Sequence, residues 1–195
     1  MSVQVASYPV IGIGLSAGGL DALRELLSYL PSPAGATFVV VPHLPIGHES
    51  HFDQVIGRVT SLQVAWAANG AIPQPEHLYV LPPQYELGFQ EERFRLIPRQ
   101  NTEKINRMVD RGFAALAQAF GRRTIGIVLS GTGSDGVAGV KAIEHKGGIV
   151  MAQHPKTAKF EGMPASVIAH DHPDMIGTPQ QLADLLINHL PYSQA

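Results

Sequence analysis

The sequence contains no cysteine, so disulfide bonds, thiolate metal sites and a cysteine nucleophile are excluded. Charged residues are also scarce, at 15% of the chain, and the formal net charge is −2. Because there is no dense run of lysine and arginine, the sequence does not predict nucleic-acid binding. No stretch approaches the roughly 20 apolar residues that a membrane-spanning helix needs. Residues 1–14 lack the basic start of a signal peptide, and we expect a cytoplasmic protein.

What the sequence does contain is apolar: 45% of its 195 residues are hydrophobic, which suits a compact globular enzyme. We expect residues 1–195 to form a single domain with its core at about 9–190. Short β-branched runs alternate with helical patterns, as in a parallel sheet covered by helices on both faces. The expected strands and helices follow in chain order: strand 9–14, helix 20–30, strand 36–43, helix 49–59, helix 105–120, strand 124–130, helix 137–148, strand 149–153, helix 163–170, strand 174–177 and helix 179–190.

Residues 63–100 differ from this rhythm, because they are rich in proline and contain short alternating runs. The segments 77–82, 85–90 and 93–97 are typical of antiparallel strands, and the last two are joined around residues 90–92. We interpret this region as an inserted or edge β-meander within the same α/β domain.

The stretch PVIGIGLSAGGLDAL, residues 9–23, matches two glycine motifs. Gly12, Gly14 and Ala17 fit the Gly-x-Gly-x-x-Gly/Ala turn of a dinucleotide site, whereas Gly14, Ser16 and Gly18 fit the Gly-x-Ser-x-Gly elbow of a hydrolase nucleophile. A dinucleotide site also needs an acidic residue at the end of the second strand. That strand ends in VVVPHLP, without an acid, so nucleotide binding is the less favoured interpretation.

Three polar side chains follow buried strands: Ser16, His43 and Asp135. The carboxyl ends of parallel strands share one edge of the sheet, where ligands bind. A serine hydroxyl becomes nucleophilic when a histidine takes its proton, and a carboxylate behind the histidine orients the ring. These residues therefore predict a Ser-His-Asp triad.

The glycines around Ser16 support the same interpretation. Gly14 and Gly18 are expected to let the chain turn sharply and hold Ser16 at the tip of the turn. The N–H of Ala17, at the start of the next helix, is a natural donor to a developing oxyanion. The glycine-rich turn at Thr132 and Gly133 can supply a second donor.

Each candidate also has an ordinary structural interpretation. Ser16 or Asp135 can cap the helix that follows it, and His43 can be a hydrogen-bonded residue at a strand end. A zinc site is conceivable from His43, His48 and His51, or from residues 170–172. No acidic residue accompanies these histidines at a recognisable spacing, so we expect neither a metal nor a cofactor.

The sequence resembles the catalytic domain of the chemotaxis protein-glutamate methylesterases from about residue 9 to residue 190. The resemblance rests on four ordered motifs: IGLSAGG with the serine, VVVPHLP with the histidine, VLSGTGSDG with the aspartate, and AQHPKTAKFEGMP after them. It implies a doubly wound, mostly parallel sheet with an antiparallel β-hairpin. It also implies Ser16 as nucleophile, His43 as general base, Asp135 as the orienting acid, and the backbone N–H groups of Ala17 and Thr132 as the oxyanion hole.

Several positions depart from the chemotaxis enzymes. Ala17, Pro42 and Thr132 stand where those enzymes usually have threonine, glutamine and often methionine, respectively. Ala17 and the segment 48–50 are more similar to the esterase-like domains that are fused to methyltransferases. Members of the family typically carry a receiver domain before the catalytic domain, and we expect none within these 195 residues.

The function that the resemblance implies is hydrolysis of γ-glutamyl methyl esters on a methylated chemoreceptor or a related signalling protein; some members of the family also deamidate receptor glutamines. A separate response regulator or methyltransferase is the implied partner. The alternative from another class is a non-catalytic signalling or interaction module that keeps the methylesterase fold.

Overall fold

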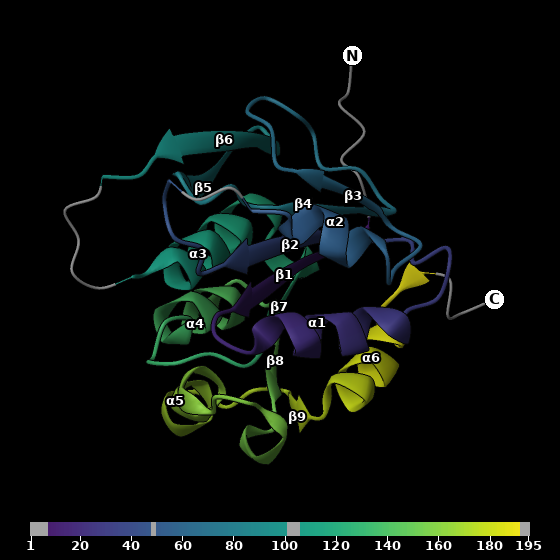
Figure 1. The fold of residues 1–195 in the computed structure, drawn as a ribbon, viewed down its shortest axis with the longest axis vertical. Coiled ribbons are helices and arrows are strands. Elements are labelled where there is room, and N and C mark those ends of the chain that lie inside the picture. The colour runs from purple at the N-terminus through teal and green to yellow at the C-terminus, as the bar shows by residue number, and fades with distance from the viewer. Residues whose placement is uncertain (1–7, 48–49, 101–105, 192–195) are drawn as a thin grey trace.

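The computed structural model describes residues 8–47, 50–100 and 106–191. Within these ranges seven parallel strands form one sheet in the order β3-β4-β2-β1-β7-β8-β9, and two more strands form an antiparallel hairpin (Figure 1). The sheet consists of β1 (Val10–Leu15), β2 (Thr37–Pro42), β3 (Gln63–Trp66), β4 (His77–Val80), β7 (Thr124–Val128), β8 (Ile149–Gln153) and β9 (Met175–Gly177). The hairpin consists of β5 (Tyr85–Gln90) and β6 (Arg93–Pro98).

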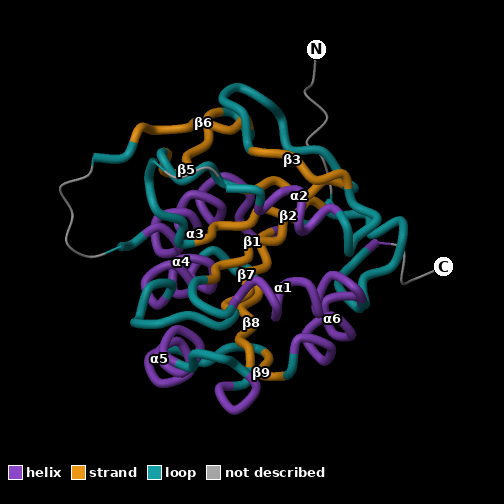
Figure 2. The backbone as a smooth tube through the Cα atoms, in the orientation of Figure 1, coloured by secondary structure: helices purple, strands orange, loops and turns teal. Residues whose placement is uncertain are grey.

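Helices cover both faces of the sheet, and Figure 2 shows the strands running between them. One face packs against α1 (Gly19–Ser28), α2 (Phe52–Gly57) and α6 (Pro179–Ile187). The other packs against α3 (Met108–Phe120), α4 (Val137–His145) and α5 (Gly162–His170). Two short 3₁₀ turns, η1 (Gly121–Arg123) and η2 (Pro155–Thr157), complete the described elements. This arrangement confirms the predicted doubly wound α/β fold. None of the described helices is long and apolar enough to cross a membrane.

The prediction for residues 77–82 was wrong in its strand direction. Instead of an antiparallel strand of a meander, β4 is a parallel strand that lies between β2 and β3 in the main sheet. The physical reason is burial on both faces: Leu78, Tyr79 and Val80 are all buried, and a continuous apolar run is typical of a parallel strand. The sheet therefore extends two strands beyond β2.

The hairpin does form as predicted, with a tight turn after Gln90. Glu91 and Glu92 both have positive φ, at 50° and 60°, which is the conformation of a two-residue turn that matches the twist of the strands. The hairpin packs on α3 through aromatic rings, since Phe89 and Phe120 lie edge to face at 4.9 Å between centroids. The hairpin thus covers α3 and is not an extension of the sheet.

The side of the sheet on which the chain adds strands changes at β1. From β1 the chain builds β2, β4 and β3 on one side, and it later returns to place β7, β8 and β9 on the other. In an open parallel sheet, such a switch point creates a crevice beyond the carboxyl ends of the two central strands. Ser16 directly follows β1, and Asp135 lies in the turn that follows β7, so the topology brings both to this crevice.

Close packing of α3 against α4 depends on Gly139. A Cβ at this position would lie 2.7 Å from Phe113 Cβ and 3.0 Å from the Cα of Asp110, and backbone atoms cannot easily move aside. We expect Gly139→Ala to lower the free energy of unfolding by about 1–3 kcal/mol. Gly57 in α2 is the matched control, because a Cβ there has its nearest neighbour at 3.9 Å.

For the control, Gly57→Ala should raise the free energy of unfolding by about 0.4–1 kcal/mol, because alanine restricts the unfolded chain. Urea unfolding of both variants measures the difference. Equal effects of the two substitutions would contradict the packing argument.

One pair of carboxyl groups lies between α4 and the end of α5. Asp171 is buried, and its Oδ2 has no hydrogen-bond partner among the described residues. The nearby Asp171 carboxylate raises the pKa of Glu144 above its ordinary value, first through charge repulsion and then through a hydrogen bond between the two side chains. The folded state therefore holds the Glu144 proton more tightly than the unfolded state does.

This pair predicts a pH-dependent gain in stability. Because the folded pKa of Glu144 is raised, its contribution is favourable at acid pH and is lost as pH rises through that pKa. Glu144→Gln should therefore increase the urea midpoint at pH 7, and the gain should vanish below about pH 4, where the wild-type carboxyl is protonated. Glu25→Gln on the exposed face of α1 controls for loss of a surface charge. A gain that is the same at both pH values would be inconsistent with repulsion.

Candidate active site

The end of β1 and the end of β2 place Ser16 beside His43. The two strands are parallel neighbours with Leu15 opposite Pro42, so the residues that follow them are adjacent in space. The N–H of His43 donates to the carbonyl of Leu15 at 3.0 Å, and the N–H of Ser16 donates to the carbonyl of Ser130 at 3.0 Å. Backbone hydrogen bonds thus hold Ser16 between the ends of β2 and β7.

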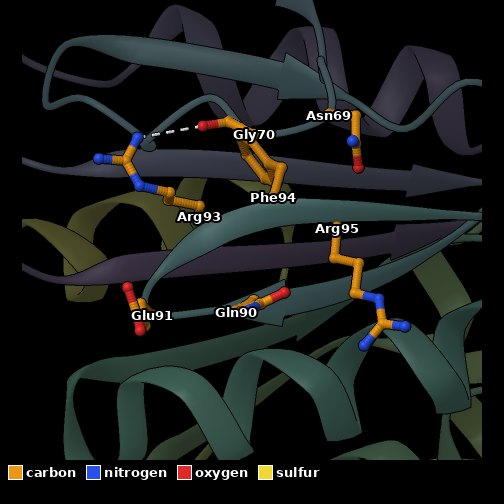
Figure 3. A pocket seen from close by; sticks show the side chains of 7 residues that line it. All are labelled: Asn69, Gly70, Gln90, Glu91, Arg93, Phe94 and Arg95. Atoms are coloured by element: carbon orange, nitrogen blue, oxygen red, sulfur yellow. Dashed lines mark hydrogen bonds between the residues drawn. The ribbon is translucent and has the colours of Figure 1, made fainter.

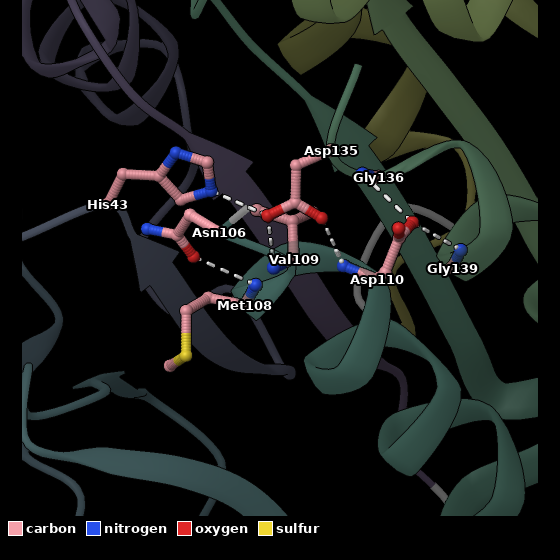
Figure 4. Close-up of polar contacts among 8 residues, drawn as sticks. All are labelled: His43, Asn106, Met108, Val109, Asp110, Asp135, Gly136 and Gly139. Carbon is pink, nitrogen blue, oxygen red and sulfur yellow. Dashed lines mark hydrogen bonds and ion pairs between the residues drawn. The ribbon is translucent and has the colours of Figure 1, made fainter. Parts of the chain in front are cut away.

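The His43 side chain forms a direct pair with Asp135. Its Nε2 lies 2.5 Å from Asp135 Oδ2, and the two side chains are only 12% and 3% exposed (Figure 4). Residues 92 positions apart in the sequence are therefore in contact, largely shielded from water. A carboxylate in this position fixes the orientation of an imidazole and stabilises its charged form.

The carboxylate of Asp135 is also bound to the start of α3. The N–H of Val109 donates to Oδ2 and the N–H of Asp110 donates to Oδ1, both at 2.9 Å. The first N–H groups of a helix lack partners within the helix and favour negative charge. The ordinary alternative from the sequence was that Asp135 caps the helix that follows it. The structure instead gives Gly136 as the N-cap of α4 and places the Asp135 side chain on α3.

Ser16 is not needed as the cap of its own helix. The N-cap of α1 is Gly18, with φ of 71° and no side-chain cap, so the second ordinary alternative is also not what the structure shows. The half-buried Ser16 side chain makes no hydrogen bond with another residue in the described part of the chain. Its hydroxyl is therefore available to a substrate and to the neighbouring imidazole.

The two glycines of the elbow serve different purposes. Gly18 has the left-handed conformation that the sharp turn requires, as predicted. Gly14 does not form the turn: it lies inside β1, and a Cβ there would be 2.3 Å from Val109 Cγ1. The prediction for Gly14 was therefore wrong, because this glycine allows α3 to pack closely on β1. The same packing accounts for Gly12, whose Cβ would meet Leu116.

The predicted oxyanion donors lie on both sides of Ser16. Ala17 follows it, and Thr132 follows Gly131, where an added Cβ would lie 2.9 Å from Ser16 Cβ. Ala17 and Thr132 are exposed, and neither N–H has a hydrogen-bond partner among the described residues. Both N–H groups are thus free to bind an oxygen of a ligand.

Two polar residues that the sequence interpretation did not identify connect these turns. The buried Ser130 hydroxyl donates to the Ala17 carbonyl at 2.9 Å and accepts the N–H of Phe160 at 3.0 Å. The Ser130 N–H donates to Gln153 Oε1 at 2.9 Å. The available signal was their position, since each is a polar residue at the carboxyl end of a buried strand.

Among the described residues, no histidine other than His43 forms a hydrogen bond with Asp135 or Ser16. His51 is the N-cap of α2, and His48 and Glu49 lie outside the described residues. The Nδ1 of His170 contacts the Ser166 carbonyl of its own helix at 2.9 Å. In the described ranges no group of three His, Asp or Glu side chains is placed to hold a metal ion.

A separate pocket of about 270 Å³ lies on the hairpin (Figure 3). The Gly70 N–H donates to the Phe94 carbonyl at 2.7 Å, and Arg93 donates to the Gly70 carbonyl at 3.2 Å. The pocket therefore lies between the loop that contains Gly70 and strand β6. It is lined by Asn69, Gly70, Gln90, Glu91, Arg93, Phe94 and Arg95, and none of these residues belongs to the Ser16 region.

A comparison with protein families matches residues 11–186 to the family described as CheB methylesterase. A relative from Leptospira interrogans is 28% identical over 93% of this chain and 94% of its own length. The Geobacter sulfurreducens protein-glutamate methylesterase/protein-glutamine glutaminase 3 is 34% identical over 82% of this chain and 44% of its own length. The Pectobacterium atrosepticum protein-glutamate methylesterase/protein-glutamine glutaminase is 29% identical over 98% of this chain and 55% of its own length.

Among solved structures, the chain is similar to the CheB methylesterase catalytic domain of Thermotoga maritima. The TM-score is 0.86 at 28% identity, and the match covers 93% of this chain and 98% of that one. The chain thus spans about half of the Geobacter and Pectobacterium relatives and nearly all of the solved catalytic domain.

Proposed function

The chain belongs to the CheB methylesterase family, and we propose that it hydrolyses the γ-methyl ester of a glutamate side chain in a protein, with Ser16, His43 and Asp135 as its catalytic residues. The observation that carries this proposal is the shielded contact between His43 and Asp135 beside a serine whose hydroxyl is free. The comparisons support the reaction class, and the geometry supports the assignment of roles.

The contact with Asp135 determines which nitrogen of His43 acts as the base. Since Nε2 contacts Asp135, Nδ1 is the nitrogen left for the Ser16 hydroxyl. As Ser16 Oγ attacks the ester carbonyl, Nδ1 takes its proton, and the imidazolium that forms is stabilised by the carboxylate. The N–H groups of Ala17 and Thr132 bind the developing oxyanion.

The second half of the reaction returns the enzyme to its starting state. The tetrahedral intermediate breaks its bond to the methoxy oxygen, which takes the proton from His43 and leaves as methanol. A water molecule then attacks the acyl-serine while His43 accepts its proton. The second tetrahedral intermediate breaks its bond to Ser16 Oγ, which takes that proton back from His43, and the products are a glutamate side chain and free Ser16. With glutamine in place of the ester, the same steps release ammonia.

A groove lies at the same edge of the sheet as the candidate site, beyond the carboxyl ends of two strands. It has a volume of about 300 Å³ and lies beyond the carboxyl ends of β3 and β4, of which β4 is the neighbour of β2. Its lining is mostly apolar and amide, with residues Ser50, Trp66, Pro82, Pro83 and Gln84. We propose that it contacts residues of the substrate protein that flank the ester, and that this substrate is a methylated chemoreceptor or related signalling protein in the cytoplasm.

Methanol release from a methylated receptor fragment tests the reaction directly. A fluorophosphonate probe tests the nucleophile without any substrate, since it labels only activated serines. We expect labelling that is lost in Ser16→Ala and kept in Ser28→Ala, an exposed serine on α1. If neither methanol nor labelling is observed for the wild-type chain, the alternative of a non-catalytic signalling module is correct.

A further inference from the structure

Asp110 holds the start of α4 in place from the first turn of α3. Its Oδ1 accepts the N–H of Gly136 at 3.0 Å and the N–H of Gly139 at 2.9 Å (Figure 4). Its own N–H donates to Asp135 Oδ1 at 2.9 Å. The two helices are therefore capped reciprocally: Asp135, from the turn before α4, caps α3, and Asp110, from α3, caps α4.

This exchange determines where Asp135 lies. Asp135 directly precedes Gly136, which has a φ of 108° and no side-chain cap of its own. A glycine in that conformation does not fix the direction of the chain by itself. The hydrogen bond from Gly136 to Asp110 attaches the backbone beside Asp135 to α3, the same helix whose N–H groups bind the Asp135 carboxylate.

We propose that Asp110 is a positioning residue, which fixes the Asp135 carboxylate against His43 through the geometry of its two hydrogen bonds. The proposal rests on the proposed function for its kinetic readout. The Asp110 carboxylate accepts backbone N–H groups of Gly136, the N-cap of α4, and of Gly139 within α4, so its action on the reaction passes through Asp135. Because only Oδ1 accepts these bonds, an amide oxygen can replace it, whereas a longer side chain cannot keep both distances.

Two substitutions separate geometry from charge. Asp110→Asn removes the charge and keeps an acceptor oxygen at the same place, so kcat should stay close to the wild-type value. Asp110→Glu keeps the charge but displaces the carboxylate by one methylene, and we expect kcat to fall by about 100-fold, the usual cost of misplacing a catalytic group. KM should change little in both variants, because substrate contacts are not altered.

A spectroscopic measurement tests the same point without substrate. The Nε2 proton of His43, shared with Asp135, should give a strongly downfield proton resonance, assigned by its absence in His43→Ala. We expect the resonance in wild type and Asp110→Asn, and its loss in Asp110→Glu. If Asp110→Glu does not fold, Asp110→Ala takes its place, with the same expected losses in kcat and in the resonance.

Thr178→Ala is the control for stability alone. The Thr178 side chain caps α6 by accepting the Gln181 N–H at 3.2 Å, so this variant also loses a helix cap but should keep kcat and the resonance. The positioning role is refuted if Asp110→Glu keeps kcat within tenfold of wild type, or if Asp110→Asn loses as much as Asp110→Glu. If the wild-type chain shows the resonance but no turnover, the proposed function is refuted. The role of Asp110 is then tested by the resonance alone, compared between the wild-type chain and the Asp110 variants.

Discussion

Replacing Ser16 by alanine should reduce kcat for ester hydrolysis by about 10⁶-fold, the scale measured for loss of the nucleophile in other triad enzymes. The loss is large because the substitution removes the attacking oxygen itself. Ser130, the nearest serine in the hydrogen-bond network, is fully buried, and its hydroxyl is bonded to the backbone at Ala17 and Phe160. The measurement is methanol release from a methylated receptor fragment under saturating substrate.

The fold of the Ser16→Ala variant should not change. The Ser16 side chain has no hydrogen-bond partner in the described residues, and its backbone bond to Ser130 remains. The urea midpoint should therefore equal that of the wild-type chain. Activity within tenfold of wild type, in a preparation free of other esterases, would remove Ser16 from the mechanism.

Asp135→Asn should have the second largest effect, a fall in kcat of about 10⁴-fold. Both carboxylate oxygens accept N–H groups of α3, and Oδ2 also contacts His43. An amide has only one acceptor oxygen, so its NH₂ must face either the Asp110 N–H or the His43 and Val109 pair. In the first case a donor faces a donor at the start of α3, and in the second the imidazole is held in the wrong tautomer.

This conflict predicts a loss of stability as well as activity. A buried N–H without a partner costs about 1–3 kcal/mol, so Asp135→Asn should also lower the free energy of unfolding by that amount. Asp184→Asn, on an exposed position of α6, serves as the control for the same chemical change. Urea unfolding and kcat are measured on both. An Asp135→Asn variant with wild-type stability would show that the bonds to α3 contribute little.

The fold and the positions of the three candidate catalytic residues could be predicted because both depend on short-range patterns. A buried strand that ends in a polar residue is visible in the sequence at Ser16 and His43, and parallel strands necessarily bring such ends to one edge. The turn at Glu91 and Glu92 was also found, although neither residue is a glycine. The predicted contact between His43 and Asp135 is present.

What could not be predicted depends on tertiary contacts. The direction of β4 is set by its neighbours β2 and β3, and the apolar run of only three residues within this strand, 78–80, was too short to outweigh the proline-rich surroundings that suggested a meander. Gly14 was interpreted as a turn residue because the motif suggested it, whereas its role is to admit Val109. Asp110 gave no signal, since an acidic residue in the first turn is common in helices.

The reciprocal capping of α3 and α4 has a consequence for amide hydrogen exchange. Amides in the first turn of a helix normally exchange quickly with solvent, because they lack an acceptor within the helix. At Val109 and Asp110 the acceptor is the buried carboxylate of Asp135, so both amides should exchange slowly and only when the carboxylate moves away. Their exchange rates, followed by NMR in deuterated water, would then report how often the Asp135 carboxylate leaves the start of α3 in the substrate-free protein.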